Sequence, residues 1–497
     1  MSIAADTPAL EAAPLDRRRV FGWMMFDWAS QPFYTLILTF VFGPYFAVAA
    51  AEWFAANGAG TEEAKAAGQA AWSRGQSLTG LAIALTAPLL GALADTSGRR
   101  MPWIAAFSVL YVLGAAGLWV MVPDGSALWL ALCFFGLAMI GAEFATIFTN
   151  ALLPGLGPPH RIGRISGMGF ALGYAGGVVS LIVVLLLFAE NEAGVTLLGN
   201  PPPFGLDAAA REGTRLVGPF AALWFALFMV PFFLWVREAP SGGRASLRSA
   251  WSDLKASLAG AARRPSLAAW LVGSMFFRDA LVALYAFAGV YAALVLGWST
   301  VQIGTFGILG AVTAALATWA GGYADERLGP KPVIVGTILI LMAACAVIVG
   351  MSRETVFGVP LAEGSAVPDR VMYVLGAVVG GAGGVLQAAS RTMMVRHADP
   401  ARPTEAFGLY ALSGKATAFL APAFIGLATT TSGSPRLGLT PILVMFAAGL
   451  MLLRWVRPEG DGGRAGAPVP RSAVIGVPTA LLAALLLLLV LLSGASP

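Results

Sequence analysis

The chain has 497 residues, of which 58% are hydrophobic and only 11% are charged, and its formal net charge is +5. Because a soluble globular protein carries about 25% charged residues, these charges cannot cover a water-soluble body of this length, and the composition excludes an ordinary soluble domain. The mean hydropathy of +0.78 instead indicates a chain that is solvated largely by lipid.

The N-terminal segment differs from a cleavable signal peptide. Residues 1–16 are small and acidic, and Arg17, Arg18 and Arg19 then precede a long apolar segment. A signal peptide needs its positive charge before a short apolar run and a small-residue cleavage site. The sequence therefore predicts that 1–20 is a cytoplasmic tail and that the first helix is retained.

Apolar runs of membrane-spanning length follow along the whole chain. About 20 apolar residues are needed for a helix to cross a hydrocarbon layer roughly 30 Å thick. We predict an all-α membrane protein with two six-helix halves, 21–236 and 268–456, then a cytoplasmic loop at 457–472 and a thirteenth span at 473–493. The first twelve spans are predicted near 22–51, 75–95, 102–122, 127–150, 165–189, 216–236, 268–296, 302–323, 332–350, 371–394, 405–428 and 437–456.

Arginine and lysine residues gather in alternate loops, beginning with the N-terminus. Cytoplasmic loops are enriched in these residues because they resist translocation. The pattern predicts a bacterial inner-membrane protein with a cytoplasmic N-terminus. It also accounts for the positive net charge as topology, without nucleic acid as a partner.

The longest cytoplasmic connection, 237–267, separates the two halves. Within it Leu247, Trp251, Leu254 and Leu258 recur at helical spacing among polar residues. This pattern predicts an amphipathic helix on the membrane surface, and a disordered linker is the alternative.

A short motif occurs once in each half, as GALADTSGRR and as GGYADERLGPK. Each copy has a glycine four residues before an aspartate, then a turn glycine and a cation. An aspartate at a helix end can pair with cations or with the N-terminus of a neighbouring helix. We predict a cytoplasmic gate, with a plain charged loop as the alternative. The gate residues are Gly91, Asp95, Gly98, Arg99, Arg100, Gly321, Asp325, Gly329 and Lys331.

A weaker repeat aligns SGMGFALGYAGG with FGLYALSGKATA. Gly167 and Gly173 then correspond to Gly408 and Gly414, and Tyr174 corresponds to Lys415. Secondary transporters are built from internal repeats, and their binding sites lie where the repeats meet.

Polar side chains within predicted spans are costly unless they face a cavity or a partner. Glu143 and Asn150 share one helical face, as do Gln387 and Arg391. A buried cation can balance a buried carboxylate, and protonation would break that balance, so proton coupling is a hypothesis and a permanent ion pair is the alternative. The candidates for solute binding or coupling are Asp27, Glu143, Asn150, Tyr174, Arg278, Asp279, Gln387, Arg391, Tyr410 and Lys415.

Signatures of enzymes are missing from the sequence. Cys133 and Cys345 lie in apolar runs, and His160 and His397 are expected in short polar loops. These residues do not have the spacing of a metal site. The chain also contains no nucleophile motif and no P-loop. We therefore expect no enzyme activity, no cofactor and no ATP-driven step.

The two halves, the central loop and the repeated motif together resemble the major facilitator superfamily, in which spans one, four, seven and ten line a central cavity. Further stretches resemble the vacuole effluxer family related to autophagy. They are FDWASQPFYTLILTFVFGPYF, NALLP, GRISGMGFALGYAGG, FFRDALVALYAFAGVYA, GGVLQAASR and FGLYALSGKAT. One departure is Asp279-Ala280, where the family usually has Asp-Gly.

The resemblance implies a secondary carrier that works by alternating access. It also implies a small polar solute, with amino-acid efflux as the suggested activity. A transport-inactive sensor or partner-binding membrane protein on the same fold is the alternative.

Overall fold

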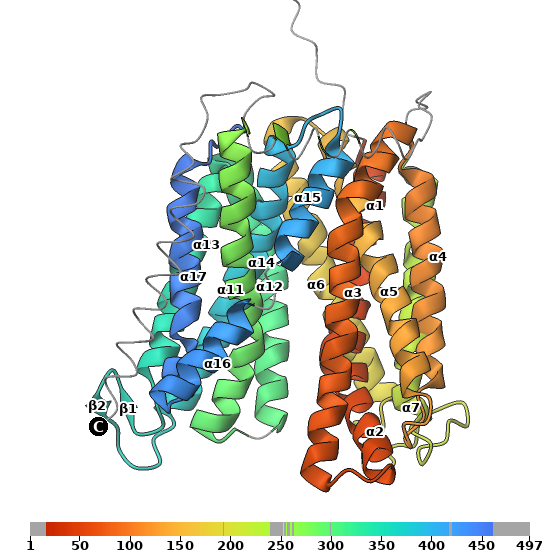
Figure 1. Ribbon diagram of the computed structural model, residues 1–497, viewed down its shortest axis with the longest axis vertical. Helices are drawn as coiled ribbons and strands as arrows, with labels where there is room; N and C mark the ends of the chain where they lie inside the picture. Colours follow the sequence, from red (N-terminus) through yellow and green to blue (C-terminus); the bar gives the residue numbers. More distant parts are fainter. Residues whose placement is uncertain are drawn as a thin grey trace, which may run out of the picture.

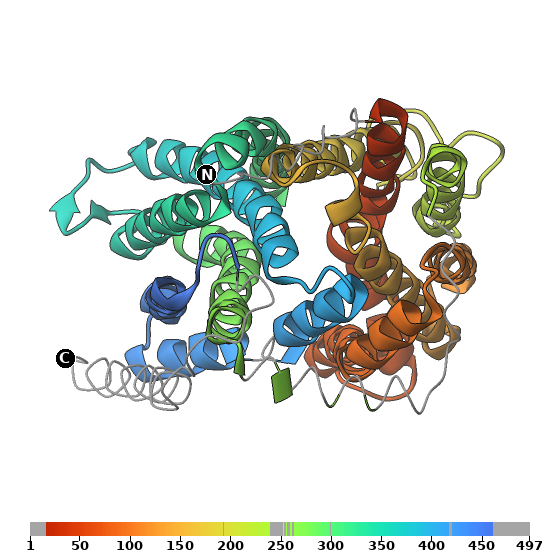
Figure 2. The same cartoon turned by 90° about the horizontal axis from the view of Figure 1, so that it is seen from above.

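The computed structural model describes residues 16–191, 193–238, 252, 255, 259–260, 263–298, 300–416 and 420–460. Within these residues the chain is almost entirely helical, and its helices form two bundles that stand side by side (Figures 1 and 2). We call α1 to α9 the N-terminal bundle and α11 to α17 the C-terminal bundle.

The N-terminal bundle begins with α1 (Arg17–Pro32), which continues through a π-helical stretch, η1 (Phe33–Phe40), into α2 (Phe42–Ala56). Its other helices are α3 (Thr61–Ser97), α4 (Met101–Gly117), η2 (Leu118–Val120), α5 (Leu128–Asn150), η3 (Leu153–Gly155), η4 (Pro159–Arg161), α6 (Ile162–Leu187), α7 (Glu212–Arg215), α8 (Val217–Phe228) and α9 (Val230–Trp235).

The C-terminal bundle contains the remaining helices and one small hairpin. Its elements are α11 (Pro265–Leu296), α12 (Thr300–Leu328), α13 (Pro330–Gly350), β1 (Thr355–Val356), β2 (Val359–Pro360), α14 (Val367–His397), α15 (Pro403–Ala416), α16 (Leu420–Ser432), η5 (Leu437–Leu439), α17 (Thr440–Leu452) and η6 (Leu453–Trp455). The two strands pair antiparallel.

Both copies of the glycine–aspartate motif lie at one end of the bundles, the upper end in Figure 1. We call this end the motif end and the opposite end, with the β1–β2 hairpin, the far end. Eleven helical segments of the described chain are long and apolar enough to cross a membrane. They correspond to eleven of the twelve predicted spans. The span predicted at 405–428 instead divides into α15 and α16, with 417–419 outside the described residues, so the count of twelve is not confirmed.

One predicted boundary is wrong, and one span has an irregular course. The second span was placed at 75–95, but α3 begins at Thr61, because residues 61–74 are rich in helix formers and carry Glu62 and Glu63 in the first turn, where acidic side chains are favourable. The first span is not one regular helix, because Pro32 cannot donate a backbone hydrogen bond and the chain widens into η1 directly after it.

Several predictions fall outside the described residues. These are residues 1–15 of the tail, most of the central loop with its amphipathic helix, residues 461–472 and the thirteenth span.

Large apolar side chains on the outer helices are exposed. Leu223 on α8 is 69% exposed, Leu234 on α9 59% and Leu339 on α13 51%. Exposed apolar surface on this scale is not compatible with water as the solvent. It fits helices whose outward faces contact lipid, with the polar side chains turned toward the other bundle.

Candidate functional site

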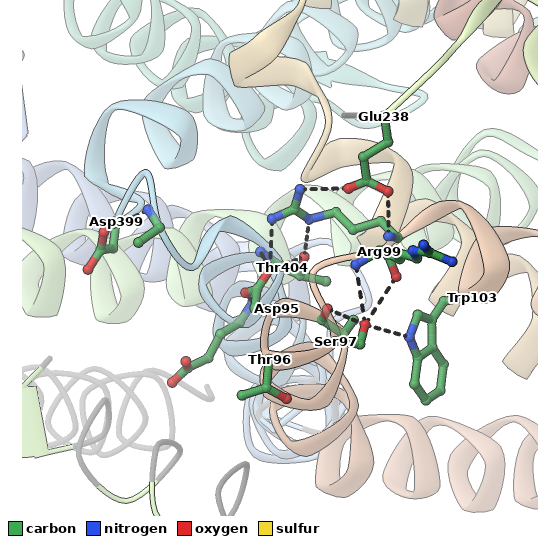
Figure 3. A network of polar contacts seen from close by, with 12 residues as sticks. Asp95, Thr96, Ser97, Arg99, Trp103, Glu238, Asp399 and Thr404 are labelled. Carbon is green, nitrogen blue, oxygen red and sulfur yellow. Dashed lines mark hydrogen bonds and ion pairs between the residues drawn. The ribbon is translucent and has the colours of Figure 1, made fainter. Parts of the chain in front are cut away.

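The first polar cluster at the motif end surrounds Asp95, two residues before α3 ends. Its Oδ1 accepts hydrogen bonds from the Thr404 hydroxyl at 2.6 Å and the Thr404 amide at 3.3 Å, and its Oδ2 accepts from the Glu405 amide at 2.8 Å. Both residues lie in the first turn of α15, where free amides and the helix dipole favour an anion. A carboxylate of the N-terminal bundle therefore caps a helix of the C-terminal bundle (Figure 3).

Arg100 extends this cluster. Its guanidinium donates to Asp95 at 2.9 Å, to the Thr404 hydroxyl at 2.7 Å and to Glu238 at 3.0 Å, and its backbone amide donates to Glu238 at 2.6 Å. The side chains of Asp95, Glu238 and Arg100 are only 3%, 14% and 19% exposed. Such charge-assisted bonds are stronger than neutral ones when water is largely excluded.

Glycines permit the close approach in this cluster. Gly98 follows the last residue of α3 and lies in the left-handed region with φ +65°. The chain therefore turns there, and Arg100 can reach back to Asp95. A methyl group at Gly91 would come within 2.8 Å of the Thr404 carbonyl oxygen, and one at Gly408 within 2.7 Å of the Ala87 carbonyl oxygen. Arg99 is exposed at the rim.

The second copy of the motif has the same backbone plan but fewer polar partners. Asp325 is 2% exposed, and neither of its carboxylate oxygens has a hydrogen-bond partner among the described residues. It lies against the first turn of α6, where a methyl group at Gly163 would collide with the carboxylate. Gly329 has φ +80°, and Lys331 donates to the Val456 carbonyl at 2.7 Å.

Charged residues beside Asp325 add contacts between the bundles. Glu326 lies 4.0 Å from Arg161 and 3.8 Å from Arg164. Arg164 also donates to the Tyr323 hydroxyl at 3.0 Å and stacks on that ring at 4.4 Å. These side chains are partly exposed, so each pair stabilises the contact by at most about 1 kcal/mol.

The deepest charged cluster surrounds Arg391 of α14, whose side chain is 4% exposed. Its Nη1 donates to Asp27 Oδ2 at 3.0 Å and to the side-chain oxygen Oδ1 of Asn150 at 3.2 Å. Its Nε donates to the Ser166 hydroxyl at 2.9 Å, and its Nη2 donates to the Ser166 carbonyl at 2.8 Å. The sequence grouped Asp27, Asn150 and Arg391 only by depth, whereas the structure places them in contact.

Aromatic rings and one glycine complete this cluster. The Arg391 guanidinium lies 4.7 Å from the Trp23 ring centre and 4.2 Å from that of Phe170, so cation–π attraction adds to the ion pair. Gly169 leaves room for the pair, since a methyl group there would come within 3.0 Å of both Arg391 and Trp23. Every named partner of this arginine belongs to the N-terminal bundle.

A third polar cluster lies further from the motif end. Gln387 Nε2 of α14 donates to the Tyr174 hydroxyl of α6 at 2.9 Å. The hydroxyl of Tyr285 on α11 faces the same two side chains. Sequence analysis missed Tyr285, although it lies seven residues after Arg278, two helical turns along the same face.

Of the remaining candidates, Arg278 and Tyr410 contact each other. Arg278 donates to the Tyr410 carbonyl at 3.0 Å and lies 4.1 Å from the centre of that ring. Asp279 is 5% exposed, and Glu143 lies within electrostatic reach of Tyr34. The side chain of Lys415 is outside the described part of the chain.

One histidine prediction is wrong. His397 was expected in a polar loop, but it is the last residue of α14 and is completely buried. Its Nδ1 bonds to the Met393 carbonyl at 3.0 Å and its Nε2 to the Ser266 hydroxyl at 2.7 Å. Helix α14 extends beyond the predicted end at 394, which places His397 against α11, where its ring stacks on Trp270. No group of side chains suited to a metal ion occurs in the described part of the chain.

Solved structures define the class of protein. The human organic anion transporter MFSD10 has a TM-score of 0.61 at 18% identity, covering 88% of this chain and 99% of that one. A bacterial homologue of the iron transporter ferroportin, in its outward-facing state, has a TM-score of 0.61 at 15% identity, covering 88% and 98%. The FucP fucose:proton symporter of E. coli gives 0.60 at 15%, covering 88% and 98%. The fold is that of a major facilitator transporter.

The family follows from the sequence comparison. Residues 15–462 match the model of the family described as "Vacuole effluxer Atg22 like", and the chain belongs to this family. It is 24% identical to the uncharacterized MFS-type transporter YxiO of Bacillus subtilis, over 88% of this chain and 94% of that protein. It is 27% identical to autophagy-related protein 22 of Cryptococcus neoformans, over 60% of this chain and 50% of that protein. The chain is thus an integral membrane protein of a transporter family.

Proposed function

We propose that this protein is a secondary-active transporter that moves a small polar solute, an amino acid in our leading hypothesis, across the bacterial inner membrane by alternating access. In this proposal the motif end faces the cytoplasm, as the distribution of Arg and Lys predicts. The described conformation is then closed to the cytoplasm.

The observation that carries the proposal is the position of Arg391. It belongs to one bundle, yet its polar and aromatic contacts come from the other. The contacts of Asp95 with α15 cross between the bundles in the opposite direction. Two independent polar clusters therefore join the bundles near the same end.

These contacts are suited to a gate because they can separate as a unit. Removing one partner of a buried ion pair costs about 3–5 kcal/mol, so the closed state is stable only while both bundles are in register. When the bundles rock apart, water or solute can replace the lost partners. A switch of this kind needs two discrete arrangements of rigid elements.

Transport is tested by uptake into proteoliposomes with a panel of radiolabelled amino acids, with and without a pH gradient. We expect saturable uptake of at least one amino acid by the natural protein and at least a tenfold lower rate for Arg391→Ala. Arg327→Ala, at an exposed position outside the predicted gate residues, is the control. The absence of uptake for every amino acid would remove the proposed solute class.

The same vesicles test proton coupling. If protons drive transport, an imposed pH gradient accumulates the solute above its equilibrium level, and Asp27→Asn or Asp279→Asn abolishes accumulation while exchange persists. Uptake that is indifferent to every gradient would leave a facilitator.

A further inference from the structure

The space between the bundles contains one aromatic residue with an unusual environment. The Tyr285 hydroxyl lies directly over Gly383 of α14, where any side-chain carbon would collide with it. The same hydroxyl faces Tyr174 of α6, so it lies between helices of both bundles. Nevertheless 39% of Tyr285 is exposed.

The exposed part of Tyr285 must open toward the space between the bundles. A side chain in a helix is directed back toward the helix N-terminus, and here that direction is toward the motif end and Gly383. The remaining ring surface then faces the far end. Ala286 and Val290, which follow on α11, are exposed too. Most of the packing of α11 is with elements of its own bundle, chiefly α17, α14 and α15.

The glycine pair on α14 leaves room for the two tyrosine rings. A methyl group at Gly384 would come within 3.1 Å of the Tyr174 ring and would collide with the Thr318 hydroxyl. Gly383 and Gly384 thus allow two tyrosines from different bundles to reach Gln387 on the same helix. Each phenol hydroxyl and the side-chain amide can both donate and accept hydrogen bonds, so several donors and acceptors are gathered at this point of the structure.

We propose that Tyr174, Gln387 and Tyr285 form the solute subsite at the motif-end limit of the central space, binding an uncharged hydrogen-bonding group of the solute through the two hydroxyls and the amide. This inference rests on the proposed transport function and refines it. None of the three side chains carries a formal charge. The subsite therefore selects an uncharged group of the solute, such as the hydroxyl or the amide of a polar side chain. The ionic ends of a zwitterion would be bound elsewhere.

The subsite also explains how binding is linked to the gate. Gln387 and Arg391 are four residues apart on one face of α14. Tyr174 and Phe170 have the same spacing on α6. A solute that binds Gln387 and Tyr174 therefore contacts α14 and α6, the same two helices that contribute Arg391 and Phe170 to the Arg391 cluster.

The test uses a reporter that leaves the subsite intact. Ala286→Cys is introduced into the full chain with Cys133→Ala, because Cys133 is exposed, while Cys345 is retained because it is buried. A charged, membrane-impermeant maleimide then labels position 286 in protein reconstituted in lipid nanodiscs. Leu223→Cys, on the lipid-facing surface of α8, is the matched control.

We expect labelling at 286 at least tenfold faster than at 223, and slower labelling when an amino acid with a polar side chain, such as serine or glutamine, is added at millimolar concentration. In the Tyr285→Phe background the concentration for half-protection should rise about tenfold, while labelling without solute stays unchanged. A Gly383→Ala variant should show the same loss of protection, because it displaces the Tyr285 hydroxyl.

Labelling needs no flux, so it separates this inference from the proposed function. Labelling at 286 as slow as at 223 would show that this face of α11 contacts lipid and would overturn the subsite. Protection that is equal with and without the Tyr285 hydroxyl, or missing for every amino acid of the panel, would overturn it too. Protection without transport would retain the subsite and reject the transport proposal.

Discussion

The two copies of the glycine–aspartate motif both end a helix and turn through a glycine with positive φ, but their turns and their polar surroundings differ. Asp95 accepts hydrogen bonds from Thr404, Glu405 and Arg100. Asp325 occupies the corresponding place against α6 but has no hydrogen-bond partner among the described residues. Repetition of a motif therefore predicts where a carboxylate lies and not how strongly it is held.

The difference arises from residues outside the motif. Thr404 aligns with Gly163 when the repeats are superimposed through Gly167 and Gly408, so α6 has no hydroxyl at the position equivalent to the one that binds Asp95. The hydroxyl beside Asp325 is that of Thr392, which lies on α14 of the same bundle as Asp325. Val236 and Val456 end the last helix of each bundle. Two residues later the first bundle has Glu238 and the second has Pro458. The N-terminal copy is the stronger contact between the bundles, and four substitutions test this comparison.

The largest effect is expected for Asp95→Ala. It removes the acceptor for three residues and leaves Arg100 without one of its two carboxylates, at a cost of about 3–5 kcal/mol to the closed state. Spin labels at the exposed positions Arg99 and Asp399, one in each bundle, should show a longer mean distance by pulsed electron resonance. Thr96→Ala, in the same turn, should leave the distance unchanged. An unaltered distance in Asp95→Ala would contradict the assigned strength.

A smaller effect is expected for Glu238→Ala. Arg100 would keep its bonds to Asp95 and Thr404, and the side chains are 14–19% exposed, so about 1–2 kcal/mol is lost. The same pair of spin labels should report a partial shift toward the longer distance. Equal populations for Glu238→Ala and Asp95→Ala would mean that the glutamate, rather than the helix cap, holds this copy closed.

Lys331→Met should have a still smaller effect. The change removes one charge-assisted bond to the Val456 carbonyl, worth about 1 kcal/mol, and keeps the apolar stem of the side chain. Because this bond lies within the C-terminal bundle, we expect a slightly lower melting temperature with no change in the distance between bundles. Arg327→Met, at an exposed position on α12, is the control. A change in bundle distance would place Lys331 in the gate after all.

The smallest effect is expected for Asp325→Asn. No hydrogen bond to the other bundle is lost, because the polar neighbours of Asp325, Thr392 and Arg396, lie on α14 of the same bundle. The shape of the side chain is also retained, so the closed state should change by less than about 0.5 kcal/mol. Spin labels at the exposed positions His160 and Arg327 should keep their distance distribution. A shift as large as that of Asp95→Ala would show that the two copies are equally strong, and would remove the asymmetry.

Sequence reasoning succeeded where one physical property dominates a long segment. Apolar runs had to become helices in lipid, because backbone groups without internal hydrogen bonds are too costly there. It failed where contacts depend on small offsets. Glu238 lies at the edge of the central loop, for which an amphipathic surface helix was predicted, and nothing in its local sequence indicates Arg100 as its partner. His397 was misplaced because α14 continues three residues past the predicted end.

The candidate site shows the same division. Polar side chains within apolar spans are conspicuous in sequence, so Asp27, Asn150 and Arg391 were among the predicted candidates. Tyr285 was missed because an isolated tyrosine in an apolar helix has no distinguishing signal. Its environment depends on Gly383, which is close to it only after α11 and α14 have packed.

The sequence by itself determined that this protein lies in a membrane, that it contains a repeated motif, and which few polar residues lie at bilayer depth, since each of these follows from the cost of placing polar groups in lipid. Only the tertiary structure decided which of those residues meet. Ion pairs and hydrogen bonds act over about 3 Å, and the packing of helices hundreds of residues apart sets distances on that scale.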